Sequence, residues 1–483
     1  MPSPLTRALG ALLTLALCSP AFAAPVAGTA GPARPFTRLD ATTTRMLAIT
    51  GVSAGARSHS AAVGNPAAAT LLAVDEDAVR AFRAAGGGAL AIPAADGATL
   101  ELELEPYALF ADGAGPTYTD DTGRHAFTPD VSLFRGHVAG DETSWAVVSM
   151  SGSGVLGMIE QHGERLTLGP VQKMSGPNAA AIGVHALAPE GSLAETISRF
   201  QCGINADNEV EYGLKPTPVE AGERMLVGPE ATNLNAARFM FNLAVDCDYE
   251  IYGVKFGANL TAATAYIMTL LGTVNLIDER DVEATLKLVY LNLWTTAADP
   301  YNATTTGTEL PEFRGYWLAN NGSISSHLQH LISGRSLGGG IAYLDAVCSN
   351  GYAVSAIDAI YSYPTVTSTW DVTVIAHELG HNLGSPHTHS CAWVNEGRWP
   401  SGTLDSCEFA EGGCASYTRH VPPDKGTIMS YCHLLGGVAN GIRLDFHSVC
   451  VPRMRSVMSN CGLFPTPGPP GTRWPRTSRR ACG

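Results

Sequence analysis

The stretch of the chain that decides its fold and chemistry reads HELGHNLGSPH, from His377 to His387. His377 and His381 are four residues apart, so on a helix they lie on one face, one turn from each other. Gly384 can adopt the positive φ that ends a helix and turns the chain back, which brings His387 toward the same point. Three imidazoles that converge in this way predict one bound Zn²⁺ ion, with a fourth position left open for water.

Glu378 follows the first histidine and lies beside the predicted metal without being a ligand. A carboxylate at this position can take a proton from a water molecule on the metal. A bare His-Glu-x-x-His motif arises often by accident, but Gly384 and His387 raise the number of specified positions to five. Such a match arises by chance about once in a few million starts. The motif therefore predicts a catalytic zinc site, with Glu378 as the catalytic base.

The composition limits the classes of protein to which the chain can belong. The 483 residues include 30 Lys and Arg against 44 Asp and Glu, a formal net charge of −14. General nucleic-acid binding needs a basic surface, so no nucleic-acid partner is expected. Hydrophobic residues make up 45% and charged residues 15%, with 52 Gly and 30 Pro. These values are typical of a loop-rich globular protein with a sizeable core.

The first residues of the chain have the pattern of a signal peptide. Arg7 supplies a basic start, an apolar run follows, and small residues precede a cleavage point after Ala23. Residues 1–23 are therefore predicted to be removed and the protein to be secreted. Cys18 allows a lipoprotein interpretation, but the bulky Leu17 before it argues against that. No later apolar run is expected to reach the roughly 20 residues of a membrane span.

Two regions with different patterns follow the predicted signal peptide. Alternation of Leu and Glu over residues 100–105 predicts a half-buried strand, and short apolar runs through residues 132–168 predict further strands. This β-rich unit contains no catalytic constellation. The proline-containing stretch from Gly213 to Asn233 is interpreted as an exposed linker. We expect a β-rich domain over residues 24–224.

Strands and helices alternate from Arg238 onward, so the second region is predicted to be an α/β domain over residues 225–464. The tail at 465–483 is rich in Pro and Arg and is predicted to be disordered. Strands are expected at Arg238–Val245, Glu283–Trp294 and Ile341–Val347, and helices at Asn259–Leu271, Ser325–Ile332 and Asp371–Leu383. After Gly384 the next regular element is expected at Val451–Ser459.

A second motif, Gly426-Thr427-Ile428-Met429-Ser430-Tyr431, lies downstream of the histidines. Together the two motifs resemble those of the metzincin metallopeptidases, and residues 235–465 look most like the bacterial reprolysin-like, adamalysin-related enzymes. Gly334-Arg335-Ser336 and the closing run Phe446-His447-Ser448-Val449-Cys450 support this resemblance. It implies a metzincin-type fold with a twisted mixed sheet, helices and a small irregular C-terminal subdomain held by disulfides. It also implies an endopeptidase that acts on protein or peptide substrates.

The resemblance assigns further roles near the zinc site. Met429 would form a hydrophobic floor under the metal. The strand from Ile341 resembles the upper-rim strand of the family, so Gly340, Ile341 and Ala342 would pair with an extended substrate. Tyr431 matches the serralysin and astacin pattern better than the reprolysin one, and its hydroxyl is predicted to assist the transition state.

The chain also departs from the reprolysin pattern. Thr388 stands where these enzymes usually carry aspartate directly after the third histidine. The acidic calcium ligand expected in their first strand falls near Phe241, so calcium is not predicted. His389 is expected to support a ligand or to line the rim, since three ligands already suffice. His327 and His330 are interpreted as structural.

The N-terminal unit has its own, weaker resemblance to the family. Phe134-Arg135-Gly136-His137-Val138 and the strands after it resemble the family's propeptide, and Cys202-Gly203 resembles the cysteine switch of latent metzincins. A thiolate is a strong zinc ligand and would displace the catalytic water. The chain is therefore expected to be a latent precursor, with its own propeptide as a partner. The alternative is that Cys202 forms a disulfide, for example with Cys247.

Other cysteines and other functions complete the expectations. By resemblance, Cys348 is expected to pair with Cys461 and Cys407 with Cys414, leaving Cys391 to pair with Cys432 or Cys450. A secreted binding or adhesion protein with a vestigial zinc site is one alternative function, against which the intact Glu378 argues. A zinc hydrolase of a non-peptide amide is another, against which the rim strand argues.

Overall fold

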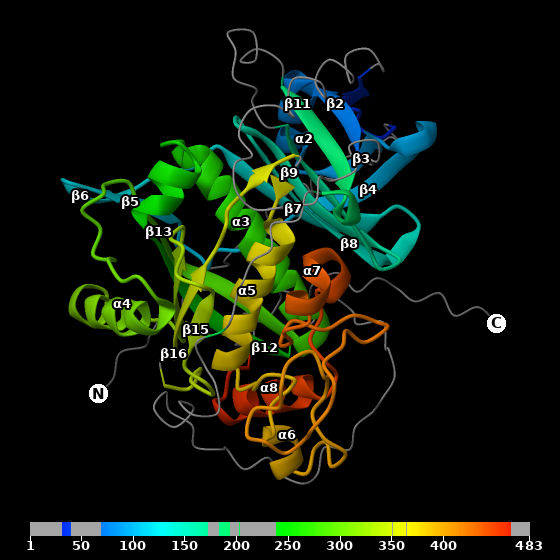
Figure 1. Ribbon diagram of the computed structural model, residues 1–483. Coiled ribbons are helices and arrows are strands. Elements are labelled where there is room, and N and C mark those ends of the chain that lie inside the picture. Colours follow the sequence, from blue (N-terminus) through cyan, green and yellow to red (C-terminus); the bar gives the residue numbers. More distant parts are fainter. Residues whose placement is uncertain are drawn as a thin grey trace, which may run out of the picture.

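The computed structural model describes residues 31–39, 69–171, 183–193, 202, 238–349, 351–363 and 365–464. The predicted signal peptide, the linker from Gly213 to Asn233 and the predicted disordered tail lie outside these residues. Figure 1 shows the main arrangement, in which two sheets lie on opposite sides of one long helix.

The N-terminal region forms a nine-stranded antiparallel sheet in the order β1-β2-β11-β10-β9-β8-β7-β4-β3. One face is covered by helix α2 (Glu76–Ala85), which buries Val79 and Phe82. In β4 the residues alternate between exposed and buried, which confirms the half-buried strand predicted over residues 100–105. The strands are β1 Phe36–Arg38, β2 Thr70–Val74, β3 Gly88–Pro93, β4 Thr99–Pro106, β7 Val131–Val138, β8 Asp141–Ser151, β9 Gly154–Gln161, β10 Glu164–Pro170 and β11 Val184–Pro189.

The second sheet has seven strands in the order β15-β16-β14-β12-β13-β5-β6. Its inner strands pair in parallel, and only the two ends of the sheet are antiparallel. This mixed α/β architecture confirms the predicted class. The strands are β5 Pro116–Asp120, β6 Gly123–Ala126, β12 Phe239–Cys247, β13 Ala284–Trp294, β14 Leu328–Ser333, β15 Gly340–Ala342 and β16 Gly351–Ala356.

Two strands of this second sheet come from the N-terminal region. The hairpin of β5 and β6 lies within the residues predicted to form a separate β-rich domain, yet β5 pairs in parallel with β13. No local sequence pattern predicts which of the two sheets this hairpin joins. The boundary between residues 224 and 225 remains a prediction, but the two regions that it separates share a sheet.

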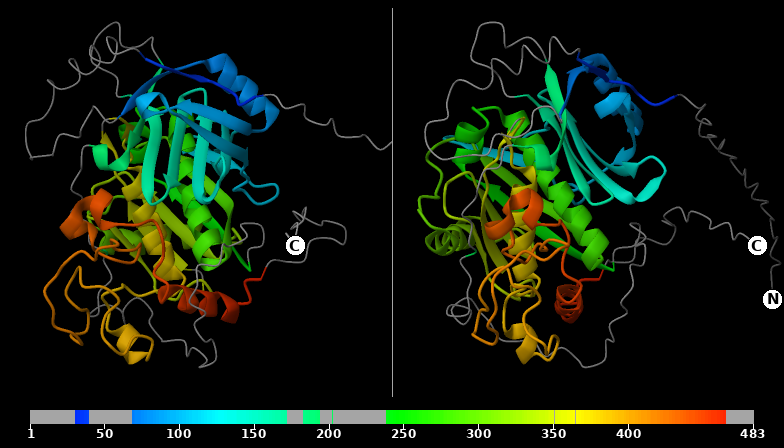
Figure 2. Two further views of the ribbon diagram at one scale, coloured as in Figure 1. Left: turned by 90° about the vertical axis from the view of Figure 1, so that its right-hand side faces the viewer. Right: turned by 45° about the vertical axis from the view of Figure 1, so that its right-hand side comes forward.

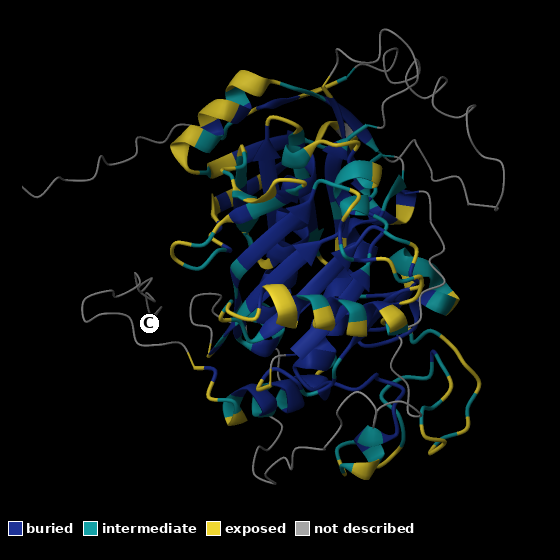
Figure 3. Ribbon diagram, turned by 90° about the vertical axis from the view of Figure 1, so that its left-hand side faces the viewer, coloured by how far each residue is buried: buried dark blue, intermediate teal, exposed yellow. Residues whose placement is uncertain are grey.

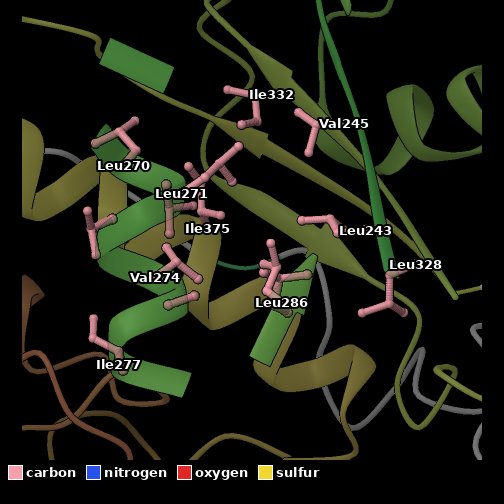
Figure 4. Close-up of a cluster of buried hydrophobic side chains, with 14 of the residues drawn as sticks. Leu243, Val245, Leu270, Leu271, Val274, Ile277, Leu286, Leu328, Ile332 and Ile375 are labelled. Atoms are coloured by element: carbon pink, nitrogen blue, oxygen red, sulfur yellow. The ribbon is translucent and has the colours of Figure 1, made fainter. Parts of the chain in front are cut away.

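Helices cover the second sheet and carry the site. The hydrophobic core between α3 and the sheet is shown in Figure 4, where Leu271 and Val274 of α3 face Leu243 and Leu286. Figure 3 shows that the central strands are buried, whereas exposed residues lie on outer helices and loops. The helices are α3 Leu260–Ile277, α4 Thr306–Asn320, α5 Ser368–Asn382, α6 Ala392–Asn395, α7 His433–Gly441 and α8 Cys450–Asn460.

The helix predicted over Ser325–Ile332 was wrong, because most of this segment is the central parallel strand β14. All six residues of β14 are buried, so both faces are covered and the alternation of exposed and buried residues that marks a strand is missing. The strand predicted over Ile341–Val347 is shorter than expected. Asp345 takes a positive φ of 56°, and the amides of Asp345 and Ala346 donate to carbonyls at the end of α5.

One helix qualifies by length and composition as a membrane span among the described residues. It runs over Leu260–Val282, with 23 residues and a mean hydropathy of 1.5, and 89% of that apolar window is buried. Four of its last five residues, from Asp278 to Asp281, are charged, so the charge-free part of the helix has 18 residues. The burial is that of a core helix.

The disulfides only partly follow the expected pairing. The bond between Cys348 and Cys461 is confirmed. The pairing of Cys407 with Cys414, and that of Cys391 with Cys432 or Cys450, was wrong. The structure joins Cys391 to Cys414 and Cys407 to Cys432. These cysteines lie in irregular loops, so their pairing depends on a chain path that the sequence does not reveal.

Candidate metal centre and active site

Three histidine side chains converge at the C-terminal end of α5. The Nε2 atoms of His377 and His381 are 3.1 Å apart, those of His381 and His387 are 3.2 Å apart, and those of His377 and His387 are 3.1 Å apart. Zinc–nitrogen bonds of 2.0–2.1 Å in tetrahedral geometry place the nitrogens about 3.3 Å from one another. The three imidazoles therefore fit one tetrahedral zinc ion.

The outer nitrogen of each ring is fixed by a hydrogen bond. Nδ1 of His377 donates to the carbonyl of Ile428 at 2.8 Å, and Nδ1 of His381 donates to the carbonyl of Ser385 at 2.7 Å. A carbonyl only accepts, so these rings carry their proton on Nδ1 and direct the Nε2 lone pair inward. Burial, together with the neighbouring histidines, lowers the pKa of His377 and His381 well below the usual value. Both rings are therefore neutral, which is the form that binds metal.

The turn after α5 depends on Gly384. This residue takes a φ of +101°, and its amide donates to the carbonyl of His381 at 2.8 Å, as expected for a residue that ends a helix. A Cβ at this position would lie 2.7 Å from Cγ2 of Val457 in α8. Glycine is therefore required both by the backbone conformation and by the close approach of α8. This turn delivers His387 to the other two histidines.

Glu378 lies between the histidines and the edge of the seven-stranded sheet. Its side chain is fully buried, and among the described residues Oε1 has no hydrogen-bond partner. A Cβ on Gly340 would collide with this oxygen, so β15 passes directly beside the carboxylate. The structure thus brings Gly340 next to Glu378, and the other predicted rim residues, Ile341 and Ala342, follow it in β15.

Cys202 lies at the fourth corner of the histidine cluster. Its Sγ is 3.5 Å from Nε2 of His381 and 3.5 Å from Oε2 of Glu378. The sulfur and the three Nε2 atoms all lie within 4.8 Å of one another. Tetrahedral zinc with a sulfur ligand at 2.3 Å would separate sulfur and nitrogen by about 3.6 Å. Cys202 forms no disulfide with Cys247.

Tyr431 holds the backbone at Cys202. Its hydroxyl accepts the amide hydrogen of Cys202 at 2.9 Å and lies 3.3 Å from Nε2 of His387. Burial raises the pKa of Tyr431 well above its usual value, so the hydroxyl keeps its proton. Both Tyr431 and Cys202 therefore face the metal position predicted from the sequence.

Met429 packs beneath the helix that carries the ligands. A Cβ at Gly380 would lie 2.5 Å from Sδ of Met429, so the small residue in the motif admits this side chain. The carbonyl of Met429 also accepts the amide hydrogen of Thr388 at 3.0 Å. Met429 thus lies against the helix segment between the first two histidines, where the resemblance places a hydrophobic floor.

Two carboxylates that support the site were missed by the sequence analysis. Glu411 accepts from Nδ1 of His387 at 2.9 Å and lies 3.3 Å from Nε2 of His389, whose ring stacks on that of His387. Burial by itself raises the pKa of Glu411, but the two histidines hold it well below its usual value. Asp405 accepts the hydroxyl hydrogen of Thr388. A carboxylate therefore still lies beside residue 388, although the sequence has threonine there.

His327 and His330 make their contacts in the seven-stranded sheet. His330 is buried in β14 with Nε2 2.8 Å from Oγ of Ser355, and burial lowers the pKa of His330 to about 3. Nδ1 of His327 accepts the amide hydrogen of Asn242 at 2.9 Å. Both residues serve the sheet, which agrees with the structural interpretation.

Comparison with known proteins places the site in a family. The three histidines form a group that could hold one metal ion. Residues 239–437 match the reprolysin model of metallo-peptidase family M12, whose members use zinc. Over this segment the chain is similar to the reprolysin-like metallopeptidases.

Two solved structures are distantly similar to this chain. Metalloproteinase-II from Bacteroides fragilis is 11% identical, with a TM-score of 0.33, and the match covers 64% of this chain and 85% of that one. A chaperone–substrate complex is 15% identical, with a TM-score of 0.28, and the match covers 46% of this chain and 35% of that one. Likenesses at this level carry no weight for function.

Proposed function

We propose that the protein is a secreted zinc endopeptidase that cleaves peptide bonds in extracellular proteins and is made as a latent precursor. The observation that carries this proposal is the geometry of four residues. Three histidine Nε2 atoms lie 3.1–3.2 Å apart, and the thiol of Cys202 stands at the fourth corner beside Glu378. In this proposal the β-rich unit over residues 24–224 acts as the propeptide of the catalytic domain.

His377, His381 and His387 would hold the zinc ion. When bound, zinc supplies a Lewis acid that lowers the pKa of a coordinated water and stabilises negative charge. Glu378 takes the proton of the attacking water and passes it to the leaving amine. The hydroxyl of Tyr431 donates a hydrogen bond to the carbonyl oxygen of the substrate as charge develops on it.

The substrate is proposed to be an extended peptide. β15 is the edge strand of the seven-stranded sheet and pairs only with β16 among the described strands. Its residue Gly340 lies against the carboxylate of Glu378. A peptide added antiparallel to this edge would place its scissile bond beside Glu378. This arrangement favours a peptide over another amide as the substrate.

Latency is proposed to come from the thiolate of Cys202, which would fill the position that water needs. Tyr431 supports this arrangement, because its hydroxyl fastens the backbone of the same residue. The hydroxyl that is proposed to assist catalysis is therefore occupied in the precursor. Release of the Cys202 segment would expose the metal and free Tyr431 together.

The proposed function is tested by casein cleavage with the full-length precursor and its Cys202→Ser variant. The precursor is expected to be inactive, and the variant is expected to cleave casein without processing. A chelator should abolish the activity, and added zinc should restore it. An inactive Cys202→Ser variant that contains one equivalent of zinc would favour the alternative, a binding or adhesion protein with a vestigial site.

A further inference from the structure

Helix α3 contains no Asp, Glu, Lys or Arg over Leu260–Ile277. Every residue from Ala262 to Ile277 is buried. A helix at the surface of a globular protein normally keeps a polar face toward water, and a helix that is apolar all round is covered on all sides. In this structure one cover is the seven-stranded sheet with α5, as Figure 4 shows. The other cover is the N-terminal sheet, as Figure 2 shows.

The contact between α3 and the N-terminal sheet is close and specific. A Cβ at Gly272 would lie 3.1 Å from Cδ2 of Leu133 and 3.3 Å from Cγ1 of Val147. Polar groups on the same side of the helix are also paired. Thr269 donates to the hydroxyl of Ser149 at 2.7 Å, and Asn275 donates to the hydroxyl of Tyr107 at 2.6 Å. These side chains join one hydrophobic core that runs through both regions.

The hairpin of β5 and β6 makes a second, independent contact. The hydroxyls of Thr117 and Thr119 donate to Oδ1 of Asn292 at 3.0 and 2.9 Å. The amide of Asn292 donates in turn to the buried carboxylate of Asp246 at 2.9 Å. Loss of the hairpin would leave the buried side-chain oxygen of Asn292 without these two donors. It would also expose a long sheet edge at β13, and both changes are unfavourable.

We infer that the N-terminal sheet and hairpin are a permanent partner of the catalytic domain and stay bound after the connecting chain is cut. Release would expose the outer side of an uncharged helix together with an unpaired strand, and large exposed apolar patches are rare on soluble proteins. The partner of the mature enzyme is thus its own N-terminal region, held without a covalent bond.

A permanent contact between the N-terminal sheet and the catalytic domain changes what activation of the precursor requires. This consequence rests on the proposed function. Along the chain, Cys202 lies between the N-terminal sheet region, whose described residues end at Leu193, and the catalytic domain, whose described residues begin at Arg238. One cut on either side leaves Cys202 tethered to a bound partner, at an effective concentration in the millimolar range. Only cuts on both sides release the segment that carries the thiol. Activation therefore needs two cleavages.

The experiment uses the full chain with a recognition sequence for a site-specific protease inserted between Leu193 and Cys202, between Cys202 and Arg238, or at both places. Digested proteins are examined by gel filtration, zinc analysis and casein cleavage. The two fragments are expected to co-elute in every case. Each singly cut protein should stay at least about a hundredfold less active than the doubly cut one.

Separate elution of the N-terminal fragment after a cut between Cys202 and Arg238 would overturn the inference. Co-elution with an inactive but zinc-loaded doubly cut protein would support the permanent contact and contradict the proposed peptidase function. The Gly272→Leu variant should lose co-elution, because its side chain would push Leu133 and Val147 away. Gly315→Leu in α4, where an added Cβ meets nothing within 4 Å, is the matched control and should retain the fragment. Retention by Gly272→Leu would contradict the role of α3.

Discussion

Helices α3 and α5 are both buried along almost their whole length, yet for different reasons. α3 carries no charge, and its burial follows from a sheet on each side. α5 buries the polar groups of Asp371, His377, Glu378 and His381. Buried polar groups are costly unless they are paired or bind a ligand. The burial of the uncharged helix α3 therefore indicates an interface between the two sheets. The burial of polar groups in α5 indicates a functional site.

The two helices are in direct contact. Tyr266 of α3 donates to Oδ2 of Asp371 in α5 at 2.6 Å, and the amides of Asp358 and Ala359 donate to the same carboxylate at 2.9 Å. The start of the ligand-bearing helix is thus fixed by α3. Substitutions in the two helices should still separate their roles, since one carries chemistry and the other carries packing.

The largest effect is expected from Glu378→Ala in the Cys202→Ser background. Glu378 lies beside the three histidines but is not expected to be a zinc ligand, so zinc content should stay at one equivalent. Loss of the general base should lower kcat by about 10²- to 10⁴-fold. Metal analysis and casein turnover on the same sample check this. Substantial residual activity in a zinc-loaded variant would contradict the mechanism.

The opposite behaviour is expected from Leu271→Ala in α3. Leu271 is fully buried, with a relative exposure of 0%. Its truncation would therefore leave a cavity in the core. The free energy of unfolding should fall by about 2–5 kcal/mol. In the Cys202→Ser background, casein cleavage per folded molecule should not change. Chemical denaturation and active-site titration check this.

The control for Leu271→Ala is Leu318→Ala in α4, whose side chain is 55% exposed. It should cost little stability, because truncation there opens no cavity. Equal losses in the two variants would show that α3 is not the packing helix of the molecule.

Features that are local in the chain could be predicted from the sequence, whereas features that depend on distant segments could not. The histidines converge because their spacing is local to one helix and one turn, so the sequence contains the whole signal. The role of Glu411 depends on an irregular loop, and nothing near residue 411 marks it. The strand at Leu328–Ser333 resembled a helix because both of its faces are buried. The hairpin of β5 and β6 joins a sheet whose other strands lie more than a hundred residues away.

A smaller effect is expected from Glu411→Gln. Its carboxylate orients His387 through Nδ1, and such supporting contacts typically contribute 10- to 100-fold in metal affinity. Zinc affinity should fall by about that factor while the unfolding of the zinc-loaded protein changes little. Competition with a chromogenic chelator checks this. Glu408→Gln is the control, since Glu408 pairs with Arg419 in the same loop, and an equal loss there would refute the assignment.

The smallest effect, with two opposite signs, is expected from Tyr431→Phe. In the Cys202→Ser background the missing hydroxyl removes a donor to the developing oxyanion, so kcat should fall about tenfold with little change in KM. In the intact precursor the same change removes the acceptor for the amide of Cys202, so residual activity should rise. A tyrosine that only packs would lower neither kcat nor latency. Steady-state kinetics on both backgrounds therefore distinguishes a packing role from a hydroxyl that serves latency before cleavage and catalysis after it.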